Sequence, residues 1–141
     1  MFGKAIVAKS AIPLLHRCLD AYSLRHKAIA NNIANVEAPG YSRARVRFED
    51  KLKKALFDRS QALVTTDEKH IGERERHVEK VQPEVEIDTA NAGLNGINNV
   101  DIDQEMANLA KNTLDYNTAA TLLRHEYTRF RLSMGGGAGA R

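Results

Sequence analysis

Apolar and small residues recur at alternating intervals of four and three along the last third of the chain. The positions that follow this rhythm are Ile102, Met106, Leu109, Thr113, Tyr116, Ala120, Leu123, Tyr127, Phe130 and Met134. This is the heptad spacing of a helix that buries one narrow stripe against a partner. Neither Gly nor Pro interrupts residues 101–134. The pattern therefore predicts a single C-terminal helix about 50 Å long, at roughly 1.5 Å per residue.

The predicted C-terminal helix has recognisable signals at both ends. Asp101 is a suitable N-cap, and Gln104 can complete a capping box by bonding back to it. Further acids at Asp103 and Glu105 suit the positive end of the helix dipole, so capping accounts for this acidic cluster. The glycines that follow Met134 end the helix, and the rest of the chain is predicted to be a flexible Gly-rich tail.

A second heptad pattern occupies the beginning of the chain. Its positions are Ala5, Ala8, Ile12, Leu15, Leu19, Tyr22, His26, Ile29 and Ile33. Pro13 fits the first turn of a helix, which places a firm helix over residues 11–34 with Ser10 as its N-cap. Two heptad helices at opposite ends of one chain favour an antiparallel coiled-coil pair. The predicted fold class is therefore mainly α, with residues 1–36 and 101–134 forming the two helical regions.

Residues 37–100 are predicted to form a small irregular region that contains β structure. The first helix ends in an Asn-rich segment, and Asn32 or Asn35 can terminate it because Asn reaches left-handed geometry more easily than most residues. Pro39 and Gly40 suit the two central positions of a type II turn, in which the glycine takes a positive φ.

Beyond this turn the pattern changes from one element to the next. Residues 41–49 alternate arginines with apolar residues, which predicts a short strand with one basic and one apolar face. Residues 50–58 have the spacing of a short helix. A second strand, placed after or around Pro83, is indicated by Val81, Val85 and Ile87. Residues 60–83 are rich in mixed charge, so a mobile loop or a weak hairpin is expected there.

The composition fits long solvated helices better than a large globular core. The 141 residues include no Trp, 4 Tyr and 4 Phe, while 28% are charged. No run approaches the roughly 18 apolar residues of a membrane span, and the start of the chain lacks a secretory signal pattern. A protein of this kind that leaves the cytoplasm must use a route without a cleaved signal. The single cysteine, Cys18, excludes an internal disulfide and is expected to be a small buried thiol.

A basic window between residues 43 and 54 raises the question of an anionic partner. It holds six Lys or Arg residues against two acids, but the formal net charge of the whole chain is only +3. Tyr41 and Phe48 are the only aromatic residues at hand for stacking on bases. A solvated or partner-facing charged surface is the favoured interpretation. A basic coiled-coil module that binds nucleic acid or an anionic surface is the alternative.

No arrangement of side chains in the sequence predicts catalysis, a metal site or a cofactor. His125 and Glu126 begin like a zinc-protease motif, but Arg129 stands where the second His is needed. His70 and His77 lack further ligands at metal-binding spacing. The sequence therefore favours a protein that acts by binding or assembly, without chemistry.

Two segments of the chain resemble a known family. The first is Ala-Asn-Asn-Ile-Ala-Asn from residue 30, followed by Pro-Gly-Tyr; the second is Asn-Asn-Val-Asp-Ile-Asp from residue 98, followed by Glu-Met and the long helix. They are similar to the N- and C-terminal motifs of the bacterial flagellar rod, hook and hook-associated family. The positions that carry the motifs are Asn31, Asn32, Asn35, Pro39, Gly40, Tyr41, Asn99, Val100 and Asp101. Ala38 departs from the family, which usually has Thr there, so the turn lacks a hydroxyl that could bond within it.

The resemblance implies a structural subunit of the basal body, and the short chain resembles the proximal rod subunits. Such a subunit would assemble with copies of itself and related rod subunits into the axial tube that transmits motor torque, with no nucleic-acid partner. It would meet basal-body and export components, since the resemblance implies export by the flagellar type III apparatus. The expected assembly interface consists of Ile12, Leu15, Leu19, Tyr22, Ile29, Ile33, Ile102, Met106, Leu109, Tyr116, Leu123, Tyr127 and Phe130.

Overall fold

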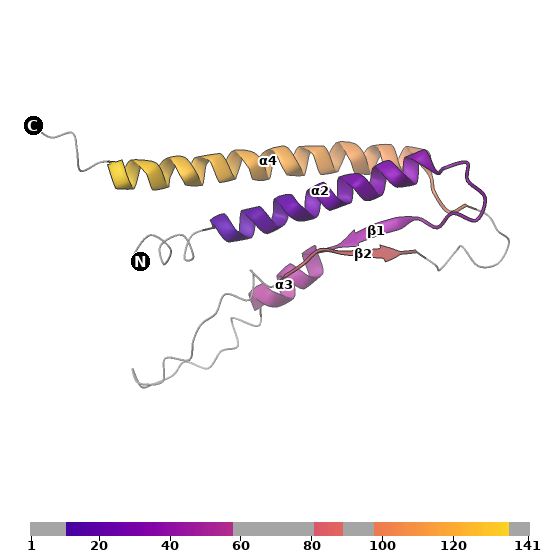
Figure 1. The fold of residues 1–141 in the computed structure, drawn as a ribbon, viewed down its shortest axis with the longest axis horizontal. Helices are drawn as coiled ribbons and strands as arrows, with labels where there is room; N and C mark the ends of the chain where they lie inside the picture. Colours follow the sequence, from indigo (N-terminus) through magenta and orange to yellow (C-terminus); the bar gives the residue numbers. More distant parts are fainter. Residues whose placement is uncertain (1–10, 58–80, 89–97, 136–141) are drawn as a thin grey trace, which may run out of the picture.

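The computed structural model describes residues 11–57, 81–88 and 98–135. The elements in this part are α2 (Ile12–Ala34), β1 (Ala44–Arg47), α3 (Glu49–Phe57), β2 (Glu84–Ile87) and α4 (Ile102–Gly135). α2 lies in the centre, with α4 antiparallel along one side and the two strands with α3 along the other (Figure 1). The predicted fold class, a mainly α chain with a long antiparallel helix pair and a small β-containing middle region, is confirmed.

Helix α2 begins and ends close to the predicted residues. Pro13 lies in its first turn, where its missing N–H has no helical partner to lose. The N-cap is Ala11, which offers no side-chain cap bond, so the prediction of Ser10 as the N-cap is wrong. The C-cap is Asn35, but its φ is −110°, and within the described ranges no residue other than glycine has a positive φ. The left-handed role expected for Asn32 or Asn35 is therefore wrong. Asn35 instead donates from Nδ2 to the carbonyl of Asn31 at 2.7 Å.

The turn after α2 has the predicted geometry. Gly40 has a φ of 73°, and the N–H of Tyr41 donates to the carbonyl of Ala38 at 3.3 Å. Pro39 and Gly40 therefore occupy the two central positions of a type II turn.

Helix α4 begins with the predicted N-cap but without the complete capping box. Asp101 Oδ1 accepts from the N–H groups of Asp103 at 2.9 Å and Gln104 at 3.2 Å. Among the described residues, no hydrogen bond joins the side chain of Gln104 to the N–H of Asp101; Gln104 Nε2 instead donates to Asn108 Oδ1 at 3.4 Å. Glu105 lies in the first turn, as predicted, but its side chain is only 1% exposed and also bonds to a residue of α2.

The short middle elements close over one side of α2. β1 pairs antiparallel with β2, and Val46 lies opposite Val85. Phe48, which follows β1, is 1% exposed and packs with Ala21 of α2 and with Val81. Cys18, Leu52 and Ala55 surround this small core.

The line of α4 that faces α2 differs from the predicted heptad stripe. The buried residues of α4 are Glu105, Asn112 and Ala119, which recur every seven residues. Asn112 donates from Nδ2 to the carbonyl of Tyr22 at 3.0 Å. The fully buried residues of α4 are therefore polar or small, while its apolar stripe is at most half-buried and includes several exposed residues.

Some predictions fall outside the described residues. These are most of the predicted loop at residues 60–83 and nearly all of the Gly-rich tail. Over the part of the chain that the structure does describe, none of the helices has the length and apolar content needed to cross a membrane.

Candidate functional site

The side chain of Asn32 joins four segments of the chain. It lies on α2 and is 0% exposed. Its Oδ1 accepts from the N–H of Ala44 at 2.9 Å and from the hydroxyl of Tyr41 at 3.1 Å. Its Nδ2 donates to the carbonyl of Ala44 at 2.9 Å and to Glu105 Oε2 at 3.0 Å. Both donors and both acceptor positions of the amide are thus used, and they connect α2, the turn, β1 and α4.

Glu105 and Arg43 form an ion pair beside Asn32. Glu105 Oε1 contacts the guanidinium of Arg43, and the two side chains are 1% and 16% exposed. Removing such charges from water is costly, and the pair is stable only when further hydrogen bonds satisfy both ions. The second carboxylate oxygen of Glu105 accepts from Asn32, whereas Arg43 Nε is buried and has no hydrogen-bond partner among the described residues.

Asn98 ties the start of α4 to the end of α2. Its Nδ2 lies 2.6 Å from the carbonyl of Asn35, 2.8 Å from that of Val36 and 3.1 Å from that of Ala38. Its Oδ1 accepts from the N–H of Val100 at 2.8 Å. A side chain from the opposite motif thus binds three carbonyl groups of the segment just after α2, and those of Asn35 and Ala38 also accept from backbone N–H groups. Ala38, although it lacks a hydroxyl, is held through its carbonyl.

Asn99 connects the same region to the two strands. Its Oδ1 accepts from the N–H of Arg43 at 2.7 Å, and its Nδ2 donates to the carbonyl of Asp88 at 3.0 Å. The N–H of Asp88 donates to the carbonyl of Arg43 at 2.8 Å, which extends the pairing of the strands by one residue. We refer to Asn32, Tyr41, Arg43, Asn98, Asn99 and Glu105 together as the polar junction.

The structure brings part of the predicted motif into this junction and leaves part outside. Asn32, Tyr41 and Asn99 take part with their side chains. Asn35 takes part through its carbonyl, and Val100 through its N–H. The other motif positions, Asn31, Pro39, Gly40 and Asp101, are exposed.

The residues of the expected assembly interface fall into three classes in the single chain. The buried ones are Ile12 and Ile29. The half-buried ones are Leu15, Leu19, Tyr22, Ile33, Leu109, Leu123 and Phe130. The exposed ones are Ile102, Met106, Tyr116 and Tyr127. The listed residues of α2 are thus buried or half-buried within the chain, whereas several of those of α4 are exposed on its surface.

Sequence reasoning misses three members of the junction. It assigns Arg43 to a basic strand face and Glu105 to a helix cap, and it gives Asn98 only as part of a motif. A signal is present for Glu105, because polar Asn112 follows it by one heptad on a line next to the apolar stripe. Polar residues at heptad spacing indicate a helix interface that is set by hydrogen bonds.

The basic window is neutralised by acids of the same chain. Arg45 pairs with Asp88 at 3.0 Å, Arg47 with Glu86 at 2.8 Å, and Lys51 with Glu84. These pairs lie along the two strands and α3, so this surface presents charges of both signs.

Arg25 and Glu49 connect α2 to α3. Arg25 Nη2 lies 2.6 Å from both carboxylate oxygens of Glu49, and the Arg25 guanidinium lies 5.8 Å above the ring of Tyr22. Partial burial is the largest single influence and works to raise the pKa of Glu49. The hydrogen bonds and charge of Arg25, together with backbone hydrogen bonds at Glu49 and Phe48, outweigh burial and hold that pKa below its usual value.

The nearby thiol and phenol are unsuited to chemistry at neutral pH. Burial, followed by the charge of Glu49, raises the pKa of Cys18, and burial is also the main cause that raises the pKa of Tyr22. A thiol whose pKa is raised is a poor nucleophile. The described segments also contain no group of His, Cys, Asp and Glu residues arranged to hold a metal ion.

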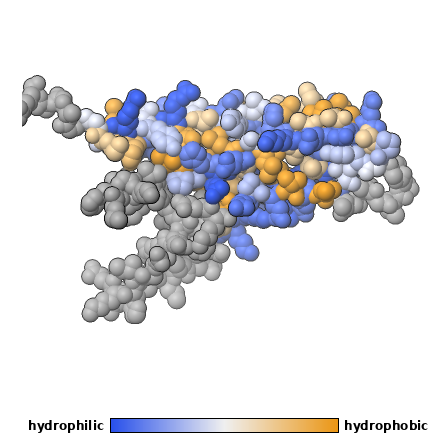
Figure 2. Space-filling model, viewed as in Figure 1, coloured by the Kyte–Doolittle hydropathy of each residue, from blue (hydrophilic) through white to orange (hydrophobic). Residues whose placement is uncertain are grey.

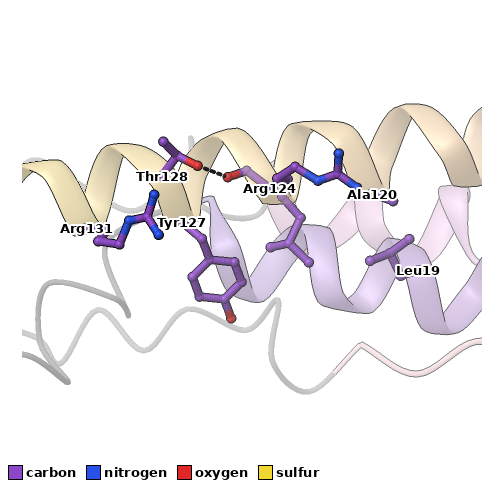
Figure 3. A pocket seen from close by; sticks show the side chains of 7 residues that line it. Leu19, Ala120, Arg124, Tyr127, Thr128 and Arg131 are labelled. Carbon is purple, nitrogen blue, oxygen red and sulfur yellow. Dashed lines mark hydrogen bonds between the residues drawn. The ribbon is translucent and has the colours of Figure 1, made fainter.

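The exposed face of the helix pair contains an apolar groove. Its volume is about 410 Å³, and it runs between α2 and the second half of α4 (Figure 3). The lining residues are Leu19, Ala120, Leu123, Arg124, Tyr127, Thr128 and Arg131. Tyr127 spans the two helices, because its hydroxyl lies 3.0 Å from His16 Nε2. Apolar patches alternate with charged residues along the same helix pair (Figure 2).

Comparison with known proteins gives the chain a family. No protein-family model matches it. It is 34% identical over 125 residues to the flagellar basal body rod protein FlgB of Borrelia hermsii, covering 86% of this chain and 93% of that protein. The FlgB of Borreliella burgdorferi is 31% identical over 121 residues, with 83% and 90% covered. The Bacillus subtilis protein of that name is 28% identical over 128 residues, with 87% and 92% covered. The chain therefore belongs to the FlgB family of flagellar basal body rod proteins.

Proposed function

We propose that this protein is a structural subunit of the proximal rod that assembles through the apolar faces of α2 and α4. The observation that carries the proposal is the outer surface of α4. Its exposed large apolar side chains are Ile102, Met106, Leu114, Tyr116, Leu122, Tyr127, Leu132 and Met134. A helix that leaves apolar residues in water along its whole length is suited to contacts with further subunits.

The polar junction gives this surface a fixed shape. Asn32 and Glu105 hold the end of α2 against the start of α4, and Asn98 holds the connecting backbone. A subunit built into a polymer needs the same relative placement of its helices in every copy, and buried polar contacts specify such a placement more strictly than apolar ones. The role requires packing and no catalysis.

The proposed partners are copies of the same chain and related rod subunits. Contact with other basal-body and export components, and export by the flagellar type III apparatus with the N-terminus uncleaved, are part of the proposal. Mass spectrometry of the protein recovered from purified basal bodies tests the last point. An N-terminus shortened at a signal-cleavage site would contradict it.

Deletion of the gene and complementation test the function. We expect deletion to abolish motility and to remove the rod from isolated basal bodies. Complementation with Tyr116→Asp should give a folded protein that does not restore motility, because Tyr116 is 42% exposed in the chain and a carboxylate in an apolar contact loses its hydration without gaining a partner.

A matched control separates assembly from folding. Ile29 is 5% exposed within the chain, so Ile29→Asp should unfold the protein itself, with loss of its helical circular dichroism. Full motility in the deletion strain would reject the rod function. Full motility with Tyr116→Asp would instead remove that position from the assembly surface.

A further inference from the structure

The groove between α2 and α4 has basic groups that are not neutralised nearby. Arg124 and Arg131 line it, and neither forms an ion pair with another residue of the described segments. Two acids are sequence neighbours of lining residues, Asp20 of Leu19 and Glu126 of Tyr127. Both already form ion pairs, since Asp20 pairs with Arg17 at 3.7 Å and Glu126 with Arg129 at 2.8 Å. The lining of the groove therefore combines apolar side chains, those of Leu19, Leu123 and Tyr127, with two arginines of α4.

The opposite end of α4 has the complementary character. Ile102 and Met106 are one helical turn apart and are 47% and 53% exposed. Asp101 and Asp103 are the sequence neighbours of Ile102 and are exposed as well. Two carboxylates outweigh the roughly +0.5 charge of the helix N-terminus. This end of α4 therefore presents a small apolar protrusion, Ile102 with Met106, next to net negative charge; we call it the apolar knob.

We propose that the groove of one copy binds the Ile102–Met106 end of α4 from a second copy, in a head-to-tail contact. The inference rests on the proposed rod function and specifies one of its assembly contacts. Leucine and tyrosine side chains of the groove cover the isoleucine and methionine, while Arg124 and Arg131 face the aspartates. Because the two contacting surfaces differ, each added copy offers a new free groove and a new free end, and the chain of contacts stays open.

Charge and distance identify a second copy as the occupant. Residues 103 and 124 of one α4 are roughly 30 Å apart at 1.5 Å per residue, so a chain cannot fill its own groove with its own knob. Residues 1–10 contain Lys4 and Lys9 and no acid, so like charges disfavour this segment as an alternative occupant beside Arg124 and Arg131.

Cysteine cross-linking tests the contact directly. In a Cys18→Ala background, one chain carries Met106→Cys and another carries Thr128→Cys, and the two are mixed with a short bis-maleimide. The protein concentration should be about 1 mM, where contacts with millimolar Kd are half-saturated. We expect the mixed dimer to exceed either homodimer by about tenfold, the ratio that a modest specific contact produces.

Two further variants identify the geometry and the charges. Leu114→Cys replaces Met106→Cys as the control, because Leu114 is 67% exposed and lies outside the proposed contact. A chain with both Met106→Cys and Thr128→Cys should give a ladder of covalent oligomers. Arg124→Glu with Arg131→Glu should reduce mixed cross-linking about tenfold, and Asp103→Lys on the other chain should restore it.

Each outcome decides the proposal. Cross-linking of Leu114→Cys at the level of Met106→Cys, or a doubly substituted chain that stops at the dimer, overturns it. Absence of rescue by Asp103→Lys overturns the charge pairing on which it rests. A strain with Arg124→Glu and Arg131→Glu that builds rods and swims normally rejects this contact while the rod function stands. Motility after gene deletion rejects the rod function itself.

Discussion

At the scale of single residues, Asn32 shows why the Asn-rich motif needs this amide at this position. The Asn32 side chain donates two hydrogen bonds and accepts two within the junction. An aspartate at this position would have nearly the same shape but would keep only acceptors, so the carbonyl of Ala44 and the carboxylate of Glu105 would lose their donor. The asparagine at position 32 is thus required for its buried hydrogen bonds and not for an unusual backbone conformation.

We expect Asn32→Asp to lower the free energy of unfolding by about 3–5 kcal/mol, because two buried acceptors lose their donor and a second carboxylate is placed beside Glu105. Urea unfolding followed by circular dichroism measures the change. The control is Asn31→Asp, the same chemical change at an exposed neighbour, which should stay within about 0.5 kcal/mol of the unmodified protein. Equal effects at both positions would contradict the role given to Asn32.

Gly40 illustrates a different requirement, which concerns the backbone alone. Its φ is +73°, and a side-chain Cβ placed there would meet no atom within 4 Å. Gly40→Val should therefore destabilise through backbone strain of about 1–3 kcal/mol and through no clash. In urea unfolding Gly40→Asn should cost less, since Asn tolerates left-handed geometry. Glu37→Ala, an exposed change before the turn, should be nearly silent, and a loss as large as that of Gly40→Val would refute the strain argument.

At the scale of elements, α3 is attached to α2 by a small apolar core and by the contact between Arg25 and Glu49. The folded-state pKa of Glu49 lies below its usual value of 4.5. A group with a depressed folded-state pKa contributes stability above its unfolded pKa, and that stability is lost as the pH falls through the folded-state pKa. The contact should therefore support the docking of α3 at neutral pH and fail in acid.

Replacing Arg25 by Met should raise the pKa of Glu49, because the hydrogen bonds that favour the carboxylate are removed while the burial stays. NMR titration of the Glu49 carboxyl measures this directly. The stability difference between Arg25→Met and the unmodified protein should be largest above pH 4.5 and shrink in more acidic solution. Arg47→Met, whose partner is Glu86, should leave the Glu49 titration unchanged; an equal shift there would show that general charge loss is responsible.

Elements are predictable from the sequence where their signals are local. The helices follow from heptad spacing, Pro13 and Asp101, and the turn follows from Pro39 with Gly40, because each signal acts within a few residues. The polar junction joins Asn32 to Glu105, which are 73 residues apart, and no local pattern specifies such a pair. The sequence also does not predict whether the apolar stripe of α4 faces α2 or the outside of the molecule. Heptad spacing is the same for a partner helix within the chain and for one in another subunit.

At the scale of the whole molecule, the protein is a long helix pair with little apolar interior. In the part of the chain that the structure describes, the buried apolar residues are Ile12, Ala21, Ala28, Ile29, Val46, Phe48, Val81 and Ala119. The fully buried residues of α4 are polar or small, and residues 131–135 of α4 are all exposed. Burial of this extent gives modest stability, and the stability is concentrated near the junction.

Hydrogen exchange of a verified monomer should therefore show a gradient along α4. Amides near Glu105 and Asn112 lie beside α2 and the junction and should exchange through global opening, whereas amides after Phe130 should exchange rapidly because the helix end has few tertiary contacts. In isolated rods the same terminal amides should become protected, since neighbouring subunits then cover the apolar side chains that the single chain exposes. The control within the same experiment is α2, whose amides near Ile29 should be protected in both forms. Strong, uniform protection from Ile102 to Met134 in the monomer would mean that α4 is fully stabilised within one chain, and would remove the link between assembly and the ordering of its end.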